Sequence, residues 1–133
     1  MNSKLHIALG TLSITVGGAI YAIYRPHTLL YQLFPSSDHS LLSDLRATPP
    51  PLPWFVIYNL PGALWSLAYI LIIHGFYAHT PLRQRLVIAS IVPLIGAASE
   101  LMQAAHLLPG HYDTIDLLCY SIPYLAYLAI SSL

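Results

Sequence analysis

Four long runs of apolar residues alternate with polar segments along the chain. The hydrocarbon core of a bilayer, about 30 Å thick, is crossed by roughly 20 apolar residues in helical conformation. The first run, residues 5–24, has this length and contains no charged side chain. Three further runs cover residues 59–78, 86–107 and 115–133. The pattern predicts an all-α fold in which residues 1–133 form a single integral membrane domain, a bundle of four transmembrane helices.

The segment between the first two runs, residues 25–58, is polar and rich in proline. Pro49, Pro50, Pro51 and Pro53 cannot continue a helix, because proline lacks the backbone N–H and clashes with the preceding turn. Upstream of them, apolar residues recur at helical spacing. This predicts a loop outside the hydrocarbon that carries short interfacial helices, with the apolar positions Leu29, Leu30, Leu33, Phe34, Leu41, Leu42 and Leu45.

The boundaries of the later runs carry residues that are typical of helix ends. Asn59 is expected to cap the second span, with Pro61 in its first turn, where a missing N–H is tolerated. Pro93 predicts a kink in the third span. Asp113 is expected to cap the fourth span, and Asp116 then lies in the first turn, near the positive end of the helix dipole.

Charged side chains are scarce, and their positions predict an orientation. They make up 8% of the chain, whereas soluble domains carry charge at about a quarter of positions. Lys4, Arg83 and Arg85 fall on one side of the predicted bundle, and Arg25 and Arg46 on the other. Since basic residues prefer the cytoplasmic side, both termini are predicted to lie in the cytoplasm (N-in/C-in). The acidic residues Asp38, Asp44, Asp113 and Asp116 then lie on the outer side, and Glu100 lies in the outer half of the third span.

Glu100 is the most informative residue, because a carboxylate within a membrane span costs several kcal/mol unless it is protonated, paired or in contact with water. Gln103 follows at i+3 on the neighbouring surface of the predicted helix and is expected to share its hydrogen bonds. Gly96 precedes at i−4 and allows close approach of another helix. Two interpretations remain open at this stage: a polar contact between helices, and the wall of a binding pocket.

A polar and aromatic face continues along the fourth span from Asp116. Its members are Tyr120, Tyr124, Tyr127 and Ser131. Such a face is expected to turn inward, either as the wall of a cavity or as part of the packed core. On the second span Asn59, Ser66 and Tyr69 share one side, with Trp65 close by, and are expected to close the same outer pocket.

Several other classes of function lack their sequence signals. His27, His39, His106 and His111 fall on the acidic side, but no His-x-x-x-His or Glu-x-x-His spacing is present, so neither a metal nor a cofactor is predicted. Cys119 has no histidine nearby in sequence to activate it as a nucleophile. Five basic residues do not form a stripe that could follow a phosphate backbone, which argues against nucleic-acid binding.

Two motifs in the last third of the chain resemble the VanZ-like family of membrane proteins. The family shows Glu-x-x-Gln on one helix and Gly-Arg-x-x-Asp-x-x-Asp leading into the next, and the chain has Glu100-Leu101-Met102-Gln103 and Gly110-His111-Tyr112-Asp113-Thr114-Ile115-Asp116. Leu60-Pro61-Gly62-Ala63-Leu64-Trp65 is similar to the Pro-Asp-x-Leu-Trp opening of an earlier span. His111 stands where arginine is usual, and Gly62 where aspartate is common. Arg25 is a candidate to supply the missing cation.

The resemblance implies a multi-pass protein of the bacterial cytoplasmic membrane with a role in the cell envelope. The leading hypothesis is a non-enzymatic protein, surrounded by membrane lipids, that binds an envelope lipid, a peptidoglycan-related molecule or a glycopeptide antibiotic. An accessory subunit of a larger membrane complex is the alternative, and an intramembrane enzyme with Glu100 as general base, assisted by Asp116 or His111, is the third. The candidate binding residues are Arg25, Asn59, Trp65, Glu100, Gln103, His111, Asp113, Asp116 and Tyr120.

Overall fold

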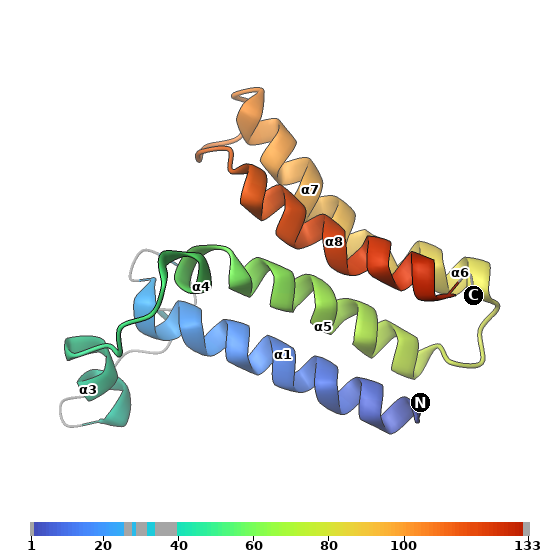
Figure 1. Cartoon of the computed structure of the whole chain (residues 1–133), viewed down its shortest axis with the longest axis horizontal. Helices are drawn as coiled ribbons and strands as arrows, with labels where there is room; N and C mark the ends of the chain where they lie inside the picture. Colours follow the sequence, from blue (N-terminus) through green and yellow to red (C-terminus); the bar gives the residue numbers. More distant parts are fainter. Residues whose placement is uncertain (1, 26–27, 29–31, 34–39, 132–133) are drawn as a thin grey trace.

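A computed structural model of the chain describes residues 2–25, 28, 32–33 and 40–131. All regular secondary structure in this part of the chain is α-helical (Figure 1). The elements are α1 (Ser3–Tyr24), α3 (Leu41–Ala47), α4 (Trp54–Tyr58), α5 (Leu60–Phe76), α6 (Leu82–Ala89), α7 (Ile91–Ala104) and α8 (Thr114–Ser131). The prediction of an all-α fold is therefore confirmed.

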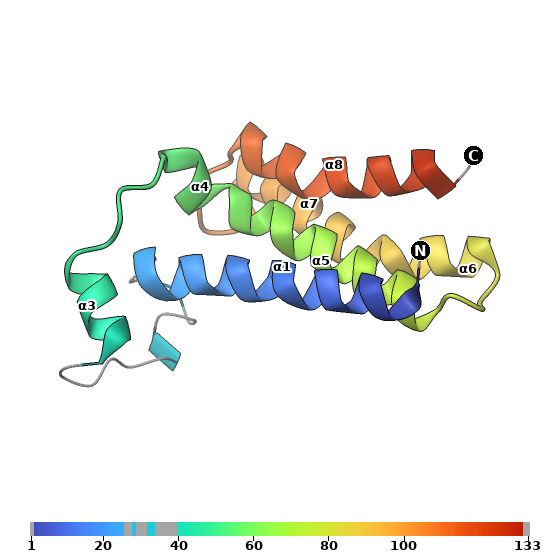
Figure 2. The same cartoon turned by 60° about the horizontal axis from the view of Figure 1, so that its bottom comes forward.

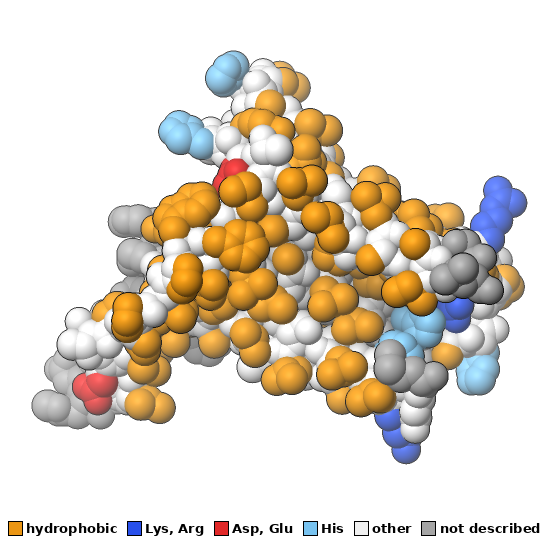
Figure 3. Space-filling view, viewed as in Figure 1, with side chains coloured by type: hydrophobic (Ala, Val, Ile, Leu, Met, Phe, Trp, Pro, Cys, Tyr) orange, Lys and Arg blue, Asp and Glu red, His pale blue; other side chains and the backbone are white. Residues whose placement is uncertain are grey.

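Three helical segments are long and apolar enough to cross a membrane: α1, the segment Leu82–Ala104 that combines α6 and α7, and α8. They correspond to the first, third and fourth predicted spans. The second predicted span forms α5, which is apolar but has only 17 residues. Many large apolar side chains are exposed, including Leu94 and Ile95 of α7, at 59% and 64%. This surface, orange in Figure 3, suits contact with lipid better than contact with water.

The long helices form two pairs that run along one another. Helix α1 packs against α5, and α7 packs against α8, with α5 also contacting α8 (Figures 1 and 2). The first pair approaches closely at Gly10, where a Cβ atom would lie 2.9 Å from the carbonyl oxygen of Ala68. A glycine at this position therefore permits near backbone contact, as small residues commonly do between membrane helices.

Two hydrogen bonds connect the segment between α1 and α5 to the C-terminal end of α1. Arg46 Nε, from α3, donates a hydrogen bond to the carbonyl of Ala22 (2.9 Å), and the Tyr24 hydroxyl donates to the carbonyl of Pro50 (2.8 Å). Helix α4 begins directly after the prolines and leads into α5 with only Asn59 between them. Helical structure thus begins at Trp54, before the predicted start at residue 59. Predicted positions outside the described residues are His27, Leu29, Leu30, Phe34, Asp38, His39 and Leu133.

The third predicted span is interrupted at Ser90, between α6 and α7, three residues before Pro93, where a kink was predicted. Proline has no N–H, so the bond that a regular helix would make from residue 93 to the carbonyl of Ala89 is absent, and the disturbance falls on the preceding turn. Two tyrosines supply donors here. Tyr69 of α5 donates its hydroxyl hydrogen to the carbonyl of Ile88 and Tyr124 of α8 to that of Leu86, each at 3.0 Å.

Removing the hydroxyl group of either Tyr69 or Tyr124 is expected to destabilise the bundle. We expect Tyr69→Phe and Tyr124→Phe each to lower the free energy of unfolding by about 1 kcal/mol, because each variant leaves a carbonyl in the span with one donor fewer. Thermal unfolding of the purified protein in a mild detergent measures the change. Tyr77→Phe is the control, since Tyr77 is 41% exposed. An effect in Tyr77→Phe as large as in the two test variants would contradict the assignment.

Charged side chains separate along the bundle. The acidic end, defined by Glu100, Asp113 and Asp116, holds the end of α7 and the start of α8, whereas the basic end holds Lys4, Arg83 and Arg85. On the face drawn in Figure 3, acidic side chains lie on the left and lysine and arginine on the right. The acidic residues predicted to share one side therefore do so wherever the structure describes them.

Candidate functional site

Asn59 links the helices at the acidic end. Its side chain is fully buried, and its Nδ2 donates hydrogen bonds to Asp113 Oδ2 (2.9 Å) and Asp116 Oδ1 (2.8 Å). Asn59 stands at the predicted N-cap position of α5, with Pro61 in the first turn, but its side chain makes no capping bond to α5 and its backbone angles are helical (φ −106°, ψ −40°). The side-chain amide instead reaches across to Asp113 and Asp116, where its Nδ2 donates two charge-assisted hydrogen bonds.

Asp113 connects three elements of the acidic end. Its Oδ1 accepts the N–H of Ile115 (2.8 Å), which confirms that Asp113 caps α8, and its Oδ2 accepts from Asn59. Its own backbone N–H donates to Glu100 Oε2 of α7 (3.2 Å). The Glu100 side chain is only 6% exposed. The Glu100 carboxylate therefore accepts a hydrogen bond from the backbone just before α8. This is expected, because a buried carboxylate is costly unless it is hydrogen-bonded.

Tyr120 fills the space between α5 and α7. A Cβ atom on Gly62 would lie 3.3 Å from its ring, and a Cβ atom on Gly96 would overlap the ring. The Ser66 hydroxyl donates to the backbone carbonyl of Tyr120 (2.9 Å). Further along α8, Tyr124 contacts α6, and Tyr127 is hydrogen-bonded to His74 Nδ1 (3.0 Å). The tyrosine face turns inward as predicted, and these tyrosines pack between helices.

Arg25 lies at the end of α1 among aromatic rings. Its guanidinium carbon is 4.9 Å from the centre of the Tyr21 ring and 4.8 Å from that of Tyr58. Trp65 of α5 stacks on Tyr21 with ring centres 4.8 Å apart. Arg25 also interacts electrostatically with Asp116. Arg25 therefore lies near the acidic cluster.

The two tyrosines that hold Arg25 were missed in the sequence. Tyr21 lies one helical turn before Arg25, at i−4, so its contact had a local signal. Tyr58 comes from α4 and reaches Arg25 only through the path of the long loop, which no periodicity describes. Both residues belong to the described site beside Arg25, Trp65 and Asn59.

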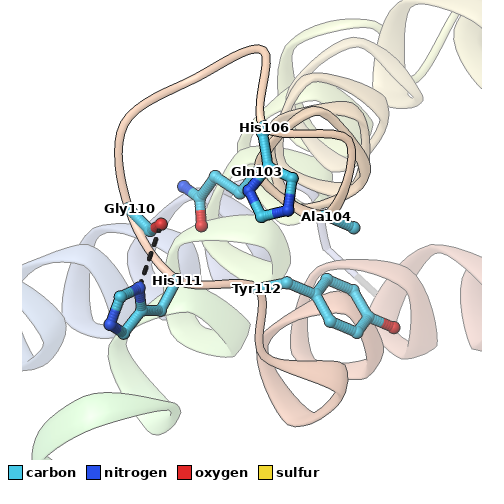
Figure 4. Close-up of a pocket in the computed structure, with 6 residues that line it drawn as sticks. All are labelled: Gln103, Ala104, His106, Gly110, His111 and Tyr112. Carbon is cyan, nitrogen blue, oxygen red and sulfur yellow. Dashed lines mark hydrogen bonds between the residues drawn. The ribbon is translucent and has the colours of Figure 1, made fainter.

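Gln103 and His111 lie apart from the carboxylates. The Gln103 side chain packs against Gly110 and not against Glu100, and both line an open pocket of about 550 Å³ with Ala104, His106, His111 and Tyr112 (Figure 4). His111 is exposed, and its Nδ1 lies 3.2 Å from the carbonyl of Gly110. The predicted sharing of hydrogen bonds between Glu100 and Gln103 is wrong, because the Gln103 side chain packs against Gly110 of the following loop, whereas Glu100 accepts the N–H of Asp113.

The charges and donors at the acidic end do not balance. Asn59, Asp113, Asp116 and Glu100 bring three carboxylates together, and Arg25 is the nearby cation, which leaves two formal negative charges if all are ionised. Asn59 Oδ1 is buried and has no hydrogen-bond partner. A positively charged hydrogen-bond donor would offset the excess negative charge.

Neither a search for metal sites nor comparisons with known proteins add to the description of the site. Within the described ranges, no group of three or more histidine, cysteine or carboxylate side chains is arranged to hold a metal ion. Comparisons of the chain with family models, with curated proteins and with solved structures give no match. Function is therefore inferred from the geometry of the acidic end and from the motifs in the sequence.

Proposed function

We propose that the chain is a VanZ-like, non-enzymatic protein of the bacterial cytoplasmic membrane that binds an amino-bearing envelope molecule at its acidic end. The observation that carries the proposal is the bridge from Asn59 to Asp113 and Asp116, adjacent to Glu100, with a net negative charge. An ammonium group offers both a positive charge and several N–H donors to such a cluster. Amino groups of this kind occur in envelope lipids, in peptidoglycan stem peptides and in glycopeptide antibiotics.

The proposal includes four membrane spans with both termini in the cytoplasm. Helices α4 and α5 together cover residues 54–76. At 1.5 Å per residue, this length is about 34 Å and is sufficient to cross the hydrocarbon core. With Lys4, Arg83 and Arg85 at the opposite end, the rule that basic residues stay inside favours an outward-facing acidic cluster.

The antibiotic version of this function is tested by neutralising the carboxylates. In a bacterial host that carries the gene, we expect Glu100→Gln and Asp116→Asn to change glycopeptide susceptibility, with ligand affinity about tenfold weaker, because each variant removes a charge-assisted contact. Asp44→Asn is the matched control, since Asp44 is exposed on α3. Protein abundance in the membrane fraction is measured in parallel. Unchanged susceptibility in correctly inserted test variants would exclude glycopeptides as the ligand.

A second function, an accessory subunit of a larger membrane complex, is favoured by the outer face of α8. Leu118, Ile122 and Leu125 recur at i, i+4 and i+7 and are 49%, 55% and 59% exposed. This stripe fits a partner helix as well as it fits lipid. Purification in a gentle detergent followed by mass spectrometry distinguishes the two functions, because a stoichiometric partner chain supports the second one.

A further inference from the structure

The planar face of the Arg25 guanidinium contacts aromatic rings, and its N–H groups are available to donate hydrogen bonds to a ligand. It lies over the rings of Tyr21 and Tyr58, and these cation–π contacts use the face of the group. Within the described part of the chain, the side chain of Arg25 donates no hydrogen bond. A planar guanidinium fixed in this way presents a fork of donors that matches the oxygens of a phosphate or carboxylate.

The surroundings of Arg25 place this fork at the depth of lipid headgroups. Arg25 directly follows the last residue of the membrane-spanning helix α1. The neighbouring α4 exposes Trp54 at 57% and Tyr58 at 41%, and the two rings stack with centres 5.3 Å apart. Aromatic residues of this kind concentrate where the hydrocarbon meets the headgroups. The anionic group nearest to such a position is a lipid phosphate.

The acidic end restricts which phospholipid can bind. Asp116 is partly exposed and interacts electrostatically with Arg25. Asp113 and Asp116 both accept hydrogen bonds from the Asn59 amide. A headgroup that carries only negative charge would bring its phosphate towards these carboxylates without compensation. A headgroup with an ammonium group beside the phosphate instead offers each charge an opposite partner, and primary ammonium adds N–H donors that a quaternary one lacks.

We propose that the acidic end binds a phosphoethanolamine headgroup, with the phosphate on the Arg25 guanidinium and the primary ammonium on Asp116. This assignment rests on the proposed binding of an amino-bearing envelope molecule and selects the lipid class among its candidates. Tyr21 and Tyr58 are positioning residues in this assignment, since their rings hold the guanidinium.

Native mass spectrometry of the full-length protein, exchanged into mixed micelles with equal amounts of phosphatidylethanolamine, phosphatidylglycerol and phosphatidylcholine, tests the assignment. We expect phosphatidylethanolamine to be retained about tenfold more than either competitor. Arg25→Gln is expected to reduce retention of that lipid about tenfold, and Arg25→Lys to reduce it less, because lysine keeps the charge but loses the fork. Asp116→Asn is expected to abolish the preference over phosphatidylcholine and phosphatidylglycerol.

Arg83→Gln, at the basic end, is the control and is expected to leave the preference unchanged, and thermal unfolding verifies that each variant is folded. Equal retention of the three lipids by the wild-type protein would overturn the assignment, and so would an unchanged preference in folded Arg25→Gln. If Asp116→Asn alters glycopeptide susceptibility while the wild-type protein shows no lipid preference, the lipid assignment fails and the proposed function stands. If neither Glu100→Gln nor Asp116→Asn alters lipid retention or glycopeptide susceptibility, the proposed function fails as well.

Discussion

Replacing Asn59 with alanine is expected to lower the free energy of unfolding by about 4 kcal/mol, the largest effect of any single change at the acidic end. The variant leaves a cavity at a fully buried position and removes the donor that Asp113 and Asp116 share. The two carboxylates then lose the hydrogen-bond donor that lies between them. Equilibrium unfolding of the purified protein in mixed micelles with increasing denaturing detergent measures the loss.

Two further variants separate the contributions at this position. Asn59→Asp keeps the volume but replaces the donor with a third acceptor, so we expect it to be as destabilising as the alanine variant. Asn2→Ala is the control, because Asn2 is exposed and caps α1 by accepting from the N–H of Lys4 (3.1 Å). A cap of this kind is worth about 1 kcal/mol. If Asn59→Asp were as stable as the wild type, the shared donor would not hold the acidic end together.

The second large effect is expected at Gly96, where any side chain meets the ring of Tyr120. We expect Gly96→Ala to lower the free energy of unfolding by about 3 kcal/mol, because the added methyl group overlaps the ring and forces α7 and α8 apart. The same denaturation measurement applies. Gly18→Ala is the matched control, since a Cβ atom at Gly18 of α1 has no neighbour within 4 Å.

A double variant tests the cause of the Gly96 effect. Tyr120→Leu removes the ring that the added methyl group would strike, so the Gly96→Ala change is expected to cost less in that background. Equal costs in both backgrounds would show that the loss arises within α7 and not at its contact with α8. The result also bears on the tyrosine face, because it measures how far Tyr120 serves packing.

Hydrophobic length was sufficient to predict the helices, because a bilayer requires long apolar runs and permits few alternatives. α1 and α8 begin within two residues of their predicted starts. Asn59 shows the limit of such reasoning. Its position before an apolar run is typical of a cap, and it does occupy the N-cap position of α5, but its side chain donates to two carboxylates that are distant in sequence.

Side-chain directions were predicted well where they depend on helical periodicity and poorly where they depend on the path of a loop. Glu100, Asp116 and Tyr120 face the interior because helical periodicity fixes their direction. Gln103 and His111 depend on the path of residues 105–113, in which His106 has φ 58° and Gly110 has φ 132°. These left-handed conformations redirect the chain and bring Gly110 against Gln103. No periodic pattern in the sequence predicts such a turn. The contact of Gln103 with Gly110, in place of the predicted one with Glu100, could therefore not be predicted from the sequence.

The separation of charge along the bundle makes the protein an electric dipole in the membrane. Together with Asp44, Arg25 and Arg46 nearby, the three carboxylates of the acidic end give a formal charge of −2, and Lys4, Arg83 and Arg85 give the basic end +3. Each unit charge moved across 100 mV corresponds to about 2.3 kcal/mol. In the orientation proposed above, a potential that is negative inside attracts the basic end to the cytoplasm. The resting voltage of an energised cell would therefore help to hold the cluster on the outer face, and a de-energised membrane would lack this contribution.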